Sequence, residues 1–220
     1  MQNGYRPASG IALTFDDGPD PASTPLVLDA LADASTSATF FVVAPRARRY
    51  PSLLDRMREE GHEVGFHCTE HVRHDAMRPE EIEADVRSGL PALVDPVRLW
   101  RTPWGLVTPA TEDVARKHGL TLVGWTADTE DWRGGNPQEM LRRIEGKLLP
   151  QAVVLMHDGI GPGAMRDGCT MTVDLIASLV FRARNRGLEP APLQELGSPL
   201  PERNPDPSIS RTSVDRGPLV

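Results

Sequence analysis

Short apolar runs alternate with longer amphipathic stretches along most of the chain, and this alternation limits the folds that it can adopt. The runs predict buried strands and the longer stretches predict helices. The expected strands are 11–15, 38–43, 63–66, 97–100, 120–125, 153–156 and a last one within 188–196. The expected helices are 24–34, 45–60, 79–94, 109–118, 137–149 and 172–186. Strands that alternate with helices imply a parallel sheet, and 220 residues fit a small or incomplete β/α barrel, with a doubly wound open sheet as the alternative.

Residues that favour helix ends support these limits. Ser23 or Thr24 is expected to cap the first helix, and Thr172 the last one. Gly61 and Gly187 follow apolar periodic stretches and are expected to stop helices there.

The chain is expected to form a single domain over 1–197. From residue 198 onward Pro, Ser, Asp and Arg dominate and few apolar residues remain to be buried. We therefore expect 198–220 to be a disordered, Pro-rich tail.

Composition narrows the classes of partner. The net charge of -7 disfavours nucleic acid and anionic membranes as partners, and no run approaches the length of a membrane span. Two cysteines are too few for a disulfide framework. If Met1 is the natural start, we expect a cytoplasmic protein, and if a signal peptide has been removed, a secreted one. Nothing in the sequence indicates an oligomeric state.

Two adjacent carboxylates, Asp16 and Asp17, stand at the end of the first expected strand, where Gly18-Pro19 breaks it. Because side chains alternate along a strand, the two should point in different directions. One can hold a cation while the other handles protons. The alternative is a plain, solvated turn.

Further polar residues follow the other expected strands, at their C-terminal ends. In a parallel β/α fold these ends share one face, where active sites are built. The residues are Asp16, Asp17, His67, His71, Arg101, Trp104, Asp128, Asp131 and His157.

His67 and His71 are four residues apart, so a helical turn would place both imidazoles on one side. Two histidines and a carboxylate form a common layout for a catalytic divalent metal, and Asp17 is the natural third ligand. Zinc is the first expectation, with cobalt, nickel or manganese as alternatives. His62 and His74 are expected to be surface or supporting residues rather than ligands.

Five motifs in this order resemble those of the NodB-homology polysaccharide deacetylases, the family 4 carbohydrate esterases. They are Thr14-Phe15-Asp16-Asp17-Gly18-Pro19, His67 to His71, Arg101-Thr102-Pro103-Trp104-Gly105, Asp128-Thr129-Glu130-Asp131-Trp132 and Val153-Val154-Leu155-Met156-His157. The resemblance covers residues 11 to about 196. It implies a distorted, incomplete (β/α)7-type barrel with parallel strands. It also implies metal-dependent removal of an acetyl group from a sugar.

The resemblance also implies a role for each site residue. Asp16 would be the general base and Arg101 would hold it, while Asp17, His67 and His71 would bind the metal. His157 would be the general acid, tuned by Asp131. Trp104 would offer its backbone N–H to the oxyanion and its ring to the sugar, and Leu155 would line the acetyl pocket. The other residues expected at the substrate are Pro103, Gly105 and Trp132.

Elementary chemistry is consistent with these roles. A carboxylate beside an arginine stays ionised and can accept a proton from water, and an imidazolium beside a carboxylate can protonate a leaving amine. Other interpretations stay open: Arg101 in a surface ion pair, His157 as a satisfied buried histidine, and Asp128 as a strand cap or a supporting residue. We expect Trp125 to pack in the core and Trp132 to form a cleft wall.

The sequence departs from the family pattern at Cys68 and Glu70, where small hydroxyl or polar residues are usual, and at Phe66, where Asn is commoner. These departures bear on the substrate more than on the reaction. The first hypothesis is deacetylation of N-acetylated amino sugars in a chitin-oligomer or peptidoglycan type glycan. Alternatives are deacetylation of a small soluble metabolite, hydrolysis of another non-peptide C–N bond, and carbohydrate binding without turnover.

Overall fold

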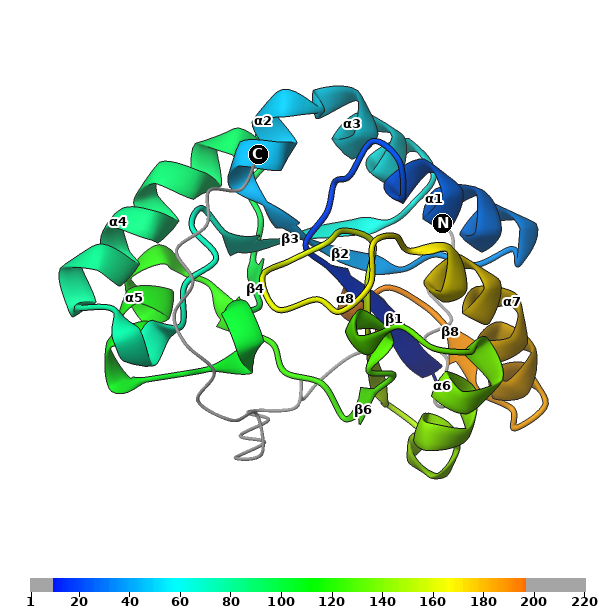
Figure 1. The fold of residues 1–220 in the computed structure, drawn as a ribbon. Coiled ribbons are helices and arrows are strands. Elements are labelled where there is room, and N and C mark those ends of the chain that lie inside the picture. Colours follow the sequence, from blue (N-terminus) through cyan, green and yellow to red (C-terminus); the bar gives the residue numbers. More distant parts are fainter. Residues whose placement is uncertain (1–9, 197–220) are drawn as a thin grey trace, which may run out of the picture.

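The computed structural model describes residues 10–196, which form a curved parallel sheet covered by helices on its outer side (Figure 1). The strand order is β5-β4-β3-β2-β1-β7-β6, and β8 pairs with the start of β1. The strands are β1 Gly10–Asp16, β2 Thr39–Val43, β3 Glu63–Cys68, β4 Leu99–Trp100, β5 Thr121–Leu122, β6 Ala127–Asp128, β7 Val153–His157 and β8 Glu189–Pro190. The incomplete β/α barrel is confirmed, and the doubly wound sheet is not adopted. The predicted tail lies outside the described residues, so the limits 1–197 and 198–220 stay predictions.

Helices follow most of the strands and return the chain to the start of the next one. They are α1 Thr24–Asp33, α2 Ala44–Arg49, α3 Pro51–Glu59, α4 Pro79–Gly89, α5 Pro109–His118, α6 Pro137–Ile144, α7 Thr170–Arg184 and α8 Leu193–Leu196. Single 3-10 turns are η1 His74–Ala76, η2 Leu90–Leu93, η3 Pro103–Gly105, η4 Asp131–Arg133 and η5 Glu145–Lys147. Within the described part of the chain, none of the helices is long and apolar enough to cross a membrane.

The predicted strand 120–125 is wrong in its limits, because the chain passes there from one edge of the sheet to the other. Leu122 pairs with β4 at Trp100, whereas Ala127 pairs with β7 at Val154. The four residues 123–126 between β5 and β6 span the opening between the two edge strands. The barrel is open at this seam, residues 123–126, because β5 and β6 do not pair with each other.

Apolar side chains pack on both faces of the sheet. Leu13 and Phe15 of β1 belong to the larger cluster, which includes Leu28 of α1 and Leu175 of α7. Ala12, the residue before Leu13, points to the opposite face and belongs to a smaller cluster inside the curve. Its other members are Phe41, Leu99, Val123, Trp125, Val153, Leu155 and Leu193. Both faces of the strands are therefore buried, as expected for a β/α barrel.

Two predicted helices are broken by proline. The helix 45–60 is interrupted at Tyr50, whose φ of -128 is extended because Pro51 disfavours a helical conformation at the preceding residue. The helix 79–94 ends at Gly89, and Pro91 lies in the 3-10 turn that follows.

Two further helices differ at one end. The helix 137–149 ends at Ile144 and continues as η5. The last helix begins at Thr170, so Thr172 is not its cap. Its buried hydroxyl instead donates to Asp131.

Candidate active site

Asp16 and Asp17 leave the end of β1 in different conformations. Asp16 is the last residue of the strand, whereas Asp17 has a φ of 75, in the region that non-glycine residues seldom adopt. Its carbonyl accepts a hydrogen bond of 2.9 Å from Nη1 of Arg46. The next amide, Gly18 N, donates to the buried Asp158 carboxylate at 3.2 Å. These two contacts hold the turn that separates the carboxylates.

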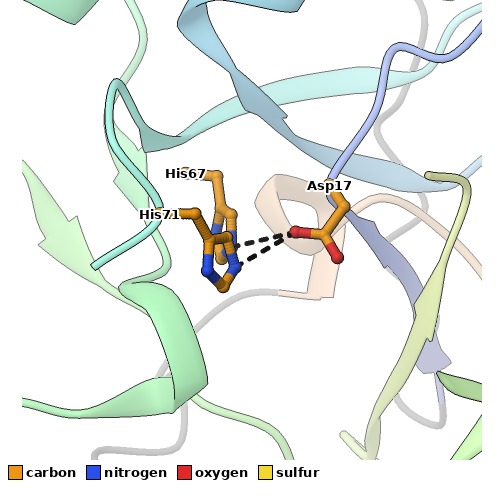
Figure 2. Close-up of side chains that lie close together, drawn as sticks. All are labelled: Asp17, His67 and His71. Carbon is orange, nitrogen blue, oxygen red and sulfur yellow. Dashed lines mark ion pairs between the residues drawn. The ribbon is translucent and has the colours of Figure 1, made fainter. Parts of the chain in front are cut away.

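The Asp17 carboxylate points toward two imidazoles, as Figure 2 shows. Its Oδ1 lies 3.5 Å from Nε2 of His67 and 3.2 Å from Nε2 of His71. His67 belongs to β3, and its Nδ1 lies 2.7 Å from the carbonyl oxygen of Arg101, which orients the ring. The predicted helical turn from His67 to His71 is wrong, because the chain continues as strand to Cys68 and then bends. The bend nevertheless brings both rings to one side.

The three side chains fit a divalent cation. Their ligand atoms lie within 4.8 Å of one another, and Asp17 Oδ1 is buried without a well-aligned hydrogen bond from any described residue. Two ligands of a tetrahedral zinc ion, each about 2.0–2.1 Å from the metal, lie about 3.3 Å apart. The two Asp17–His distances bracket that separation. Cys68, although buried next to His67, is not part of this group.

The protonation of the group also suits a cation. Burial by itself raises the pKa of the Asp17 carboxyl, but His71, with His157 and His67, holds this pKa well below its ordinary value. Burial lowers the pKa of His67, which favours the neutral imidazole that a metal requires.

Arg101 holds Asp16 inside the barrel. Its fully buried guanidinium donates to Asp16 Oδ1 at 2.9 Å and to Thr14 Oγ1 at 2.8 Å. It also donates to the carbonyl oxygens of Val123 and Gly124 in the seam, at 3.4 and 3.0 Å. The interpretation of Arg101 as a surface ion pair is therefore wrong.

His157 ends β7 and is in register with Asp16 of β1. Its Nδ1 lies 2.7 Å from Oδ1 of Asp131, and its backbone N–H donates to Oδ2 of the same carboxylate at 3.0 Å. Burial lowers the pKa of His157, but Asp131 more than compensates and the pKa rises to about 9. The ring is thus an imidazolium at neutral pH, with Nε2 as its second N–H.

Comparison with known proteins assigns this chain to a family. The model of the family described as polysaccharide deacetylase matches residues 3–123, more than half of the chain. The chain belongs to the polysaccharide deacetylase family. The chitooligosaccharide deacetylase of Bradyrhizobium sp. is 34% identical over 212 residues, which cover 89% of this chain and 95% of that protein.

Two other members support the assignment. The peptidoglycan-N-acetylglucosamine deacetylase of Bacillus cereus is 32% identical over 191 residues, covering 84% of this chain and 87% of its own. The crystal structure of the Bc1960 peptidoglycan N-acetylglucosamine deacetylase matches with a TM-score of 0.79 and 26% identity, over 85% of this chain and 87% of its own. The chain is therefore an enzyme of the deacetylase class.

Arg166 is a charged residue of this deacetylase site that sequence reasoning missed. Its Nη1 donates to Asp131 Oδ2 at 3.0 Å, and its Nη2 donates to the carbonyl oxygen of His157 at 3.0 Å. Thr172 Oγ1 donates to the same Asp131 oxygen at 2.6 Å. Burial raises the pKa of Asp131, but His157, Arg166 and Thr172 outweigh it and lower this pKa to about 2. Arg166 comes from a Gly-rich loop without periodicity, so no sequence signal located it.

The same loop packs on the Asp17 carboxylate. A Cβ atom at Gly161 would lie 2.2 Å from Oδ2 of Asp17, so only glycine fits there without a shift. Nη2 of Arg46 holds the neighbouring Ile160 carbonyl oxygen at 2.9 Å. The loop is thus one wall of the site.

The tryptophans of the deacetylase differ in burial, and Trp125 packs in the core as expected. Trp125 is buried in the inner cluster. Trp104, half-buried with a φ of 53, places its ring 4.4 Å from that of His71, edge to face. Trp132 is half-buried, and the guanidinium of Arg133 lies 4.7 Å above its ring.

Two of the remaining predicted substrate residues are buried, whereas Gly105 is half-buried. Leu155 belongs to the inner cluster and Pro103 is buried. A Cβ atom at Gly105 would lie 2.5 Å from the ring of Trp125. Asp128 accepts a hydrogen bond from Glu130 N at 2.7 Å, which matches the strand-cap interpretation.

His62 and His74 are not part of the candidate metal group, Asp17, His67 and His71, as expected. Neither histidine lies on the surface. His62 Nδ1 accepts a 3.0 Å hydrogen bond from Ala38 N, and His74 Nδ1 lies 3.0 Å from Thr111 Oγ1. Both histidines support the fold.

Proposed function

We propose that this enzyme is a divalent-metal-dependent hydrolase that removes acetyl groups from N-acetylated amino sugars in a glycan of the chitin-oligomer or peptidoglycan type. One arrangement carries the proposal: the Asp17–His67–His71 group lies beside two separate proton-transfer pairs, Asp16–Arg101 and His157–Asp131. The names of the relatives support the substrate class.

Asp17, His67 and His71 would hold the cation. When bound, it would polarise the acetyl carbonyl and lower the pKa of a water molecule toward ~7. Two imidazoles and one carboxylate suit zinc first, with cobalt, nickel and manganese as alternatives. The lowered pKa values of His67 and Asp17 both favour the protonation states that a ligand needs.

Asp16 would be the general base. Arg101 donates to only one of its oxygens in the contacts described above. Asp16 would take the proton of the attacking water, and Arg101 would keep it in place through its four hydrogen bonds.

His157 would be the general acid. Asp131 binds Nδ1, so Nε2 is the nitrogen that would give its proton to the leaving amine. The pKa of about 9 keeps the ring protonated at neutral pH, before the C–N bond breaks.

The sugar would lie against Trp104 and Trp132, with Pro103 and Gly105 positioning the Trp104 turn. The backbone N–H of Trp104 would bind the oxyanion, a contact that contributes about 3–4 kcal/mol in comparable sites. Leu155 would limit the depth available to the acetyl methyl group.

Carbohydrate binding without turnover would leave this arrangement unexplained. A binder has no use for a buried base with its own arginine or for an imidazolium with its own carboxylate, and burying such charges is unfavourable. The names of the relatives favour a glycan over a small soluble metabolite.

Acetate release tests the proposal. We expect the purified protein to release acetate from N-acetylglucosamine oligomers or peptidoglycan fragments, to lose this activity in EDTA and to regain it with one of the four metals. Release of acetate only from small acetylated metabolites would instead favour the alternative of a small-metabolite deacetylase. Failure with every acetylated sugar would contradict the proposal and favour another C–N bond.

A further inference from the structure

The two histidines of the metal group are held in different ways. His67 lies in β3, and its Nδ1 contacts the Arg101 carbonyl oxygen. His71 lies in the loop after β3, and its buried Nδ1 has no hydrogen-bond partner among the described residues. A ligating histidine is normally oriented by a hydrogen bond from its second ring nitrogen. Another contact must therefore place His71.

The bend between His67 and His71 is held by hydrogen bonds to one residue, Asp85. Asp85 of α4 is buried, and its Oδ2 accepts a hydrogen bond of 3.0 Å from Thr69 N. Its Oδ1 accepts one of 2.6 Å from Glu70 N. Thr69 Oγ1 returns a hydrogen bond of 2.7 Å to the carbonyl oxygen of Asp85. Three hydrogen bonds thus join one residue of α4 to the two residues directly before His71.

The helix that carries Asp85 is itself fixed. Ile82 and Val86, on either side of Asp85 along α4, are fully buried in the larger apolar cluster. A Cβ atom at Gly89 would lie 2.5 Å from both the Phe66 ring and Thr69 Oγ1. The helix therefore lies too close to the bend to shift without disturbing it.

We infer that Asp85 is a positioning residue for His71, which sets the distance between this ligand and Asp17 by fixing the bend at residues 69–70. The inference rests on the proposed function. The ring of Trp104, 4.4 Å from His71, limits the imidazole on another side, so the bend and this ring together replace the missing hydrogen bond to Nδ1.

Zinc affinity tests the inference separately from activity. The variant is Asp85→Asn, which keeps the shape but presents an amide NH2 to one of the two backbone donors. We expect Zn²⁺ alone, titrated into the metal-free protein, to bind about 10-fold more weakly, the lower end of the range for residues that orient metal ligands. The matched control is Glu83→Gln on the same helix, whose carboxylate faces Lys117 and His118 of α5 and not the bend. Its zinc affinity should equal that of the wild type.

Thr69→Val is the second variant, needed if Asp85→Asn does not fold. It removes the hydroxyl contacts to the Asp85 carbonyl oxygen and to Ser88 Oγ but keeps both backbone hydrogen bonds to the Asp85 carboxylate. We expect about 3-fold weaker zinc binding. Wild-type zinc affinity in a folded Asp85→Asn protein, or in Thr69→Val where the first variant is unfolded, would overturn the inference and leave the proposed function intact. Equal losses in Asp85→Asn and Glu83→Gln would also overturn it. A wild-type protein that binds no zinc, cobalt, nickel or manganese would overturn both.

Discussion

Oδ1 of Asp131 lies 2.7 Å from Nδ1 of His157, and the other oxygen of the same carboxylate accepts hydrogen bonds from Thr172 and Arg166. One buried carboxylate therefore contacts three residues from different parts of the chain. It raises the pKa of the imidazole against the effect of burial. The first two predictions follow from this carboxylate and its partners.

We predict that Asp131→Asn moves the alkaline limb of the pH–activity profile to lower pH. In the wild type, activity that needs the protonated His157 should fall as the pH rises through about 9. Without the negative charge, burial dominates and the pKa of His157 falls, so the acid is lost at a lower pH. The measurement is kcat against pH at saturating metal for both proteins. An unmoved alkaline limb would remove His157 from the role of acid.

Arg166→Met should lower the free energy of unfolding as well as the catalytic activity. The substitution leaves Asp131 with one charged partner fewer in a buried position, and breaking a buried ion pair typically costs about 3–5 kcal/mol. We expect a loss of about 3 kcal/mol in the free energy of unfolding, measured by urea denaturation. Arg182→Met removes the exposed ion pair with Glu145 and should cost less than about 1 kcal/mol. Equal effects of the two would show that the Arg166 contacts contribute little.

Asp16→Asn should abolish turnover and leave metal binding unchanged. The amide cannot accept a proton, and losing a general base lowers kcat by about 10²–10⁴-fold. Because Asp16 is not part of the metal group, zinc affinity should stay at the wild-type value. Acetate release and zinc titration on the same preparation check both halves. Asp33→Asn, at an exposed position of α1, is the control. Retained turnover in the Asp16 variant would exclude this residue as the base.

Gly161→Ala should weaken metal binding, because the added methyl group would overlap Oδ2 of Asp17. We expect zinc affinity to fall by about 10-fold, since a displaced ligand no longer meets the other two. Gly168→Ala in the same loop meets no atom within 4 Å and should bind zinc normally. Competition with a coloured chelator gives both constants. Wild-type zinc affinity in Gly161→Ala would mean that the loop moves to accommodate the methyl group and the Asp17 carboxylate stays in place.

Metal should raise the melting temperature of the wild type but not of Asp17→Asn. A ligand that binds only the folded protein stabilises it by about 2.7 kcal/mol at 100 times its dissociation constant. Thermal melts in EDTA and with added zinc measure the difference. A similar rise in the Asp17 variant would place the bound ion elsewhere.

Strand–helix alternation was sufficient to predict the parallel barrel, because buried strands and amphipathic helices leave local apolar patterns. It was not sufficient for 120–125. There Val123 N donates to Trp100 O while Thr126 N donates to Val153 O, so one apolar run is divided between two edges of the sheet. Hydrophobic patterning does not indicate which neighbour a strand will pair with.

The metal group could be predicted because Asp17, His67 and His71 are chemically distinctive and follow expected strands. The residues that position them could not. Asp85 is one acid among several on α4, and Arg166 is one of many arginines, so only the folded contacts distinguish them. The order of the strand ends was enough to predict that Asp17, His67 and His71 lie together. The residues that support them depend on how helices and loops pack above the sheet.

The seam of residues 123–126 has a mechanical consequence for the base. Arg101 binds the carbonyl oxygens of Val123 and Gly124 with the same guanidinium that binds Asp16. An additional residue in the span 123–126 would move the carbonyl oxygens of Val123 and Gly124 away from the Arg101 guanidinium. The path of the chain between the two edge strands and the placement of the base are thus coupled through one arginine in this enzyme.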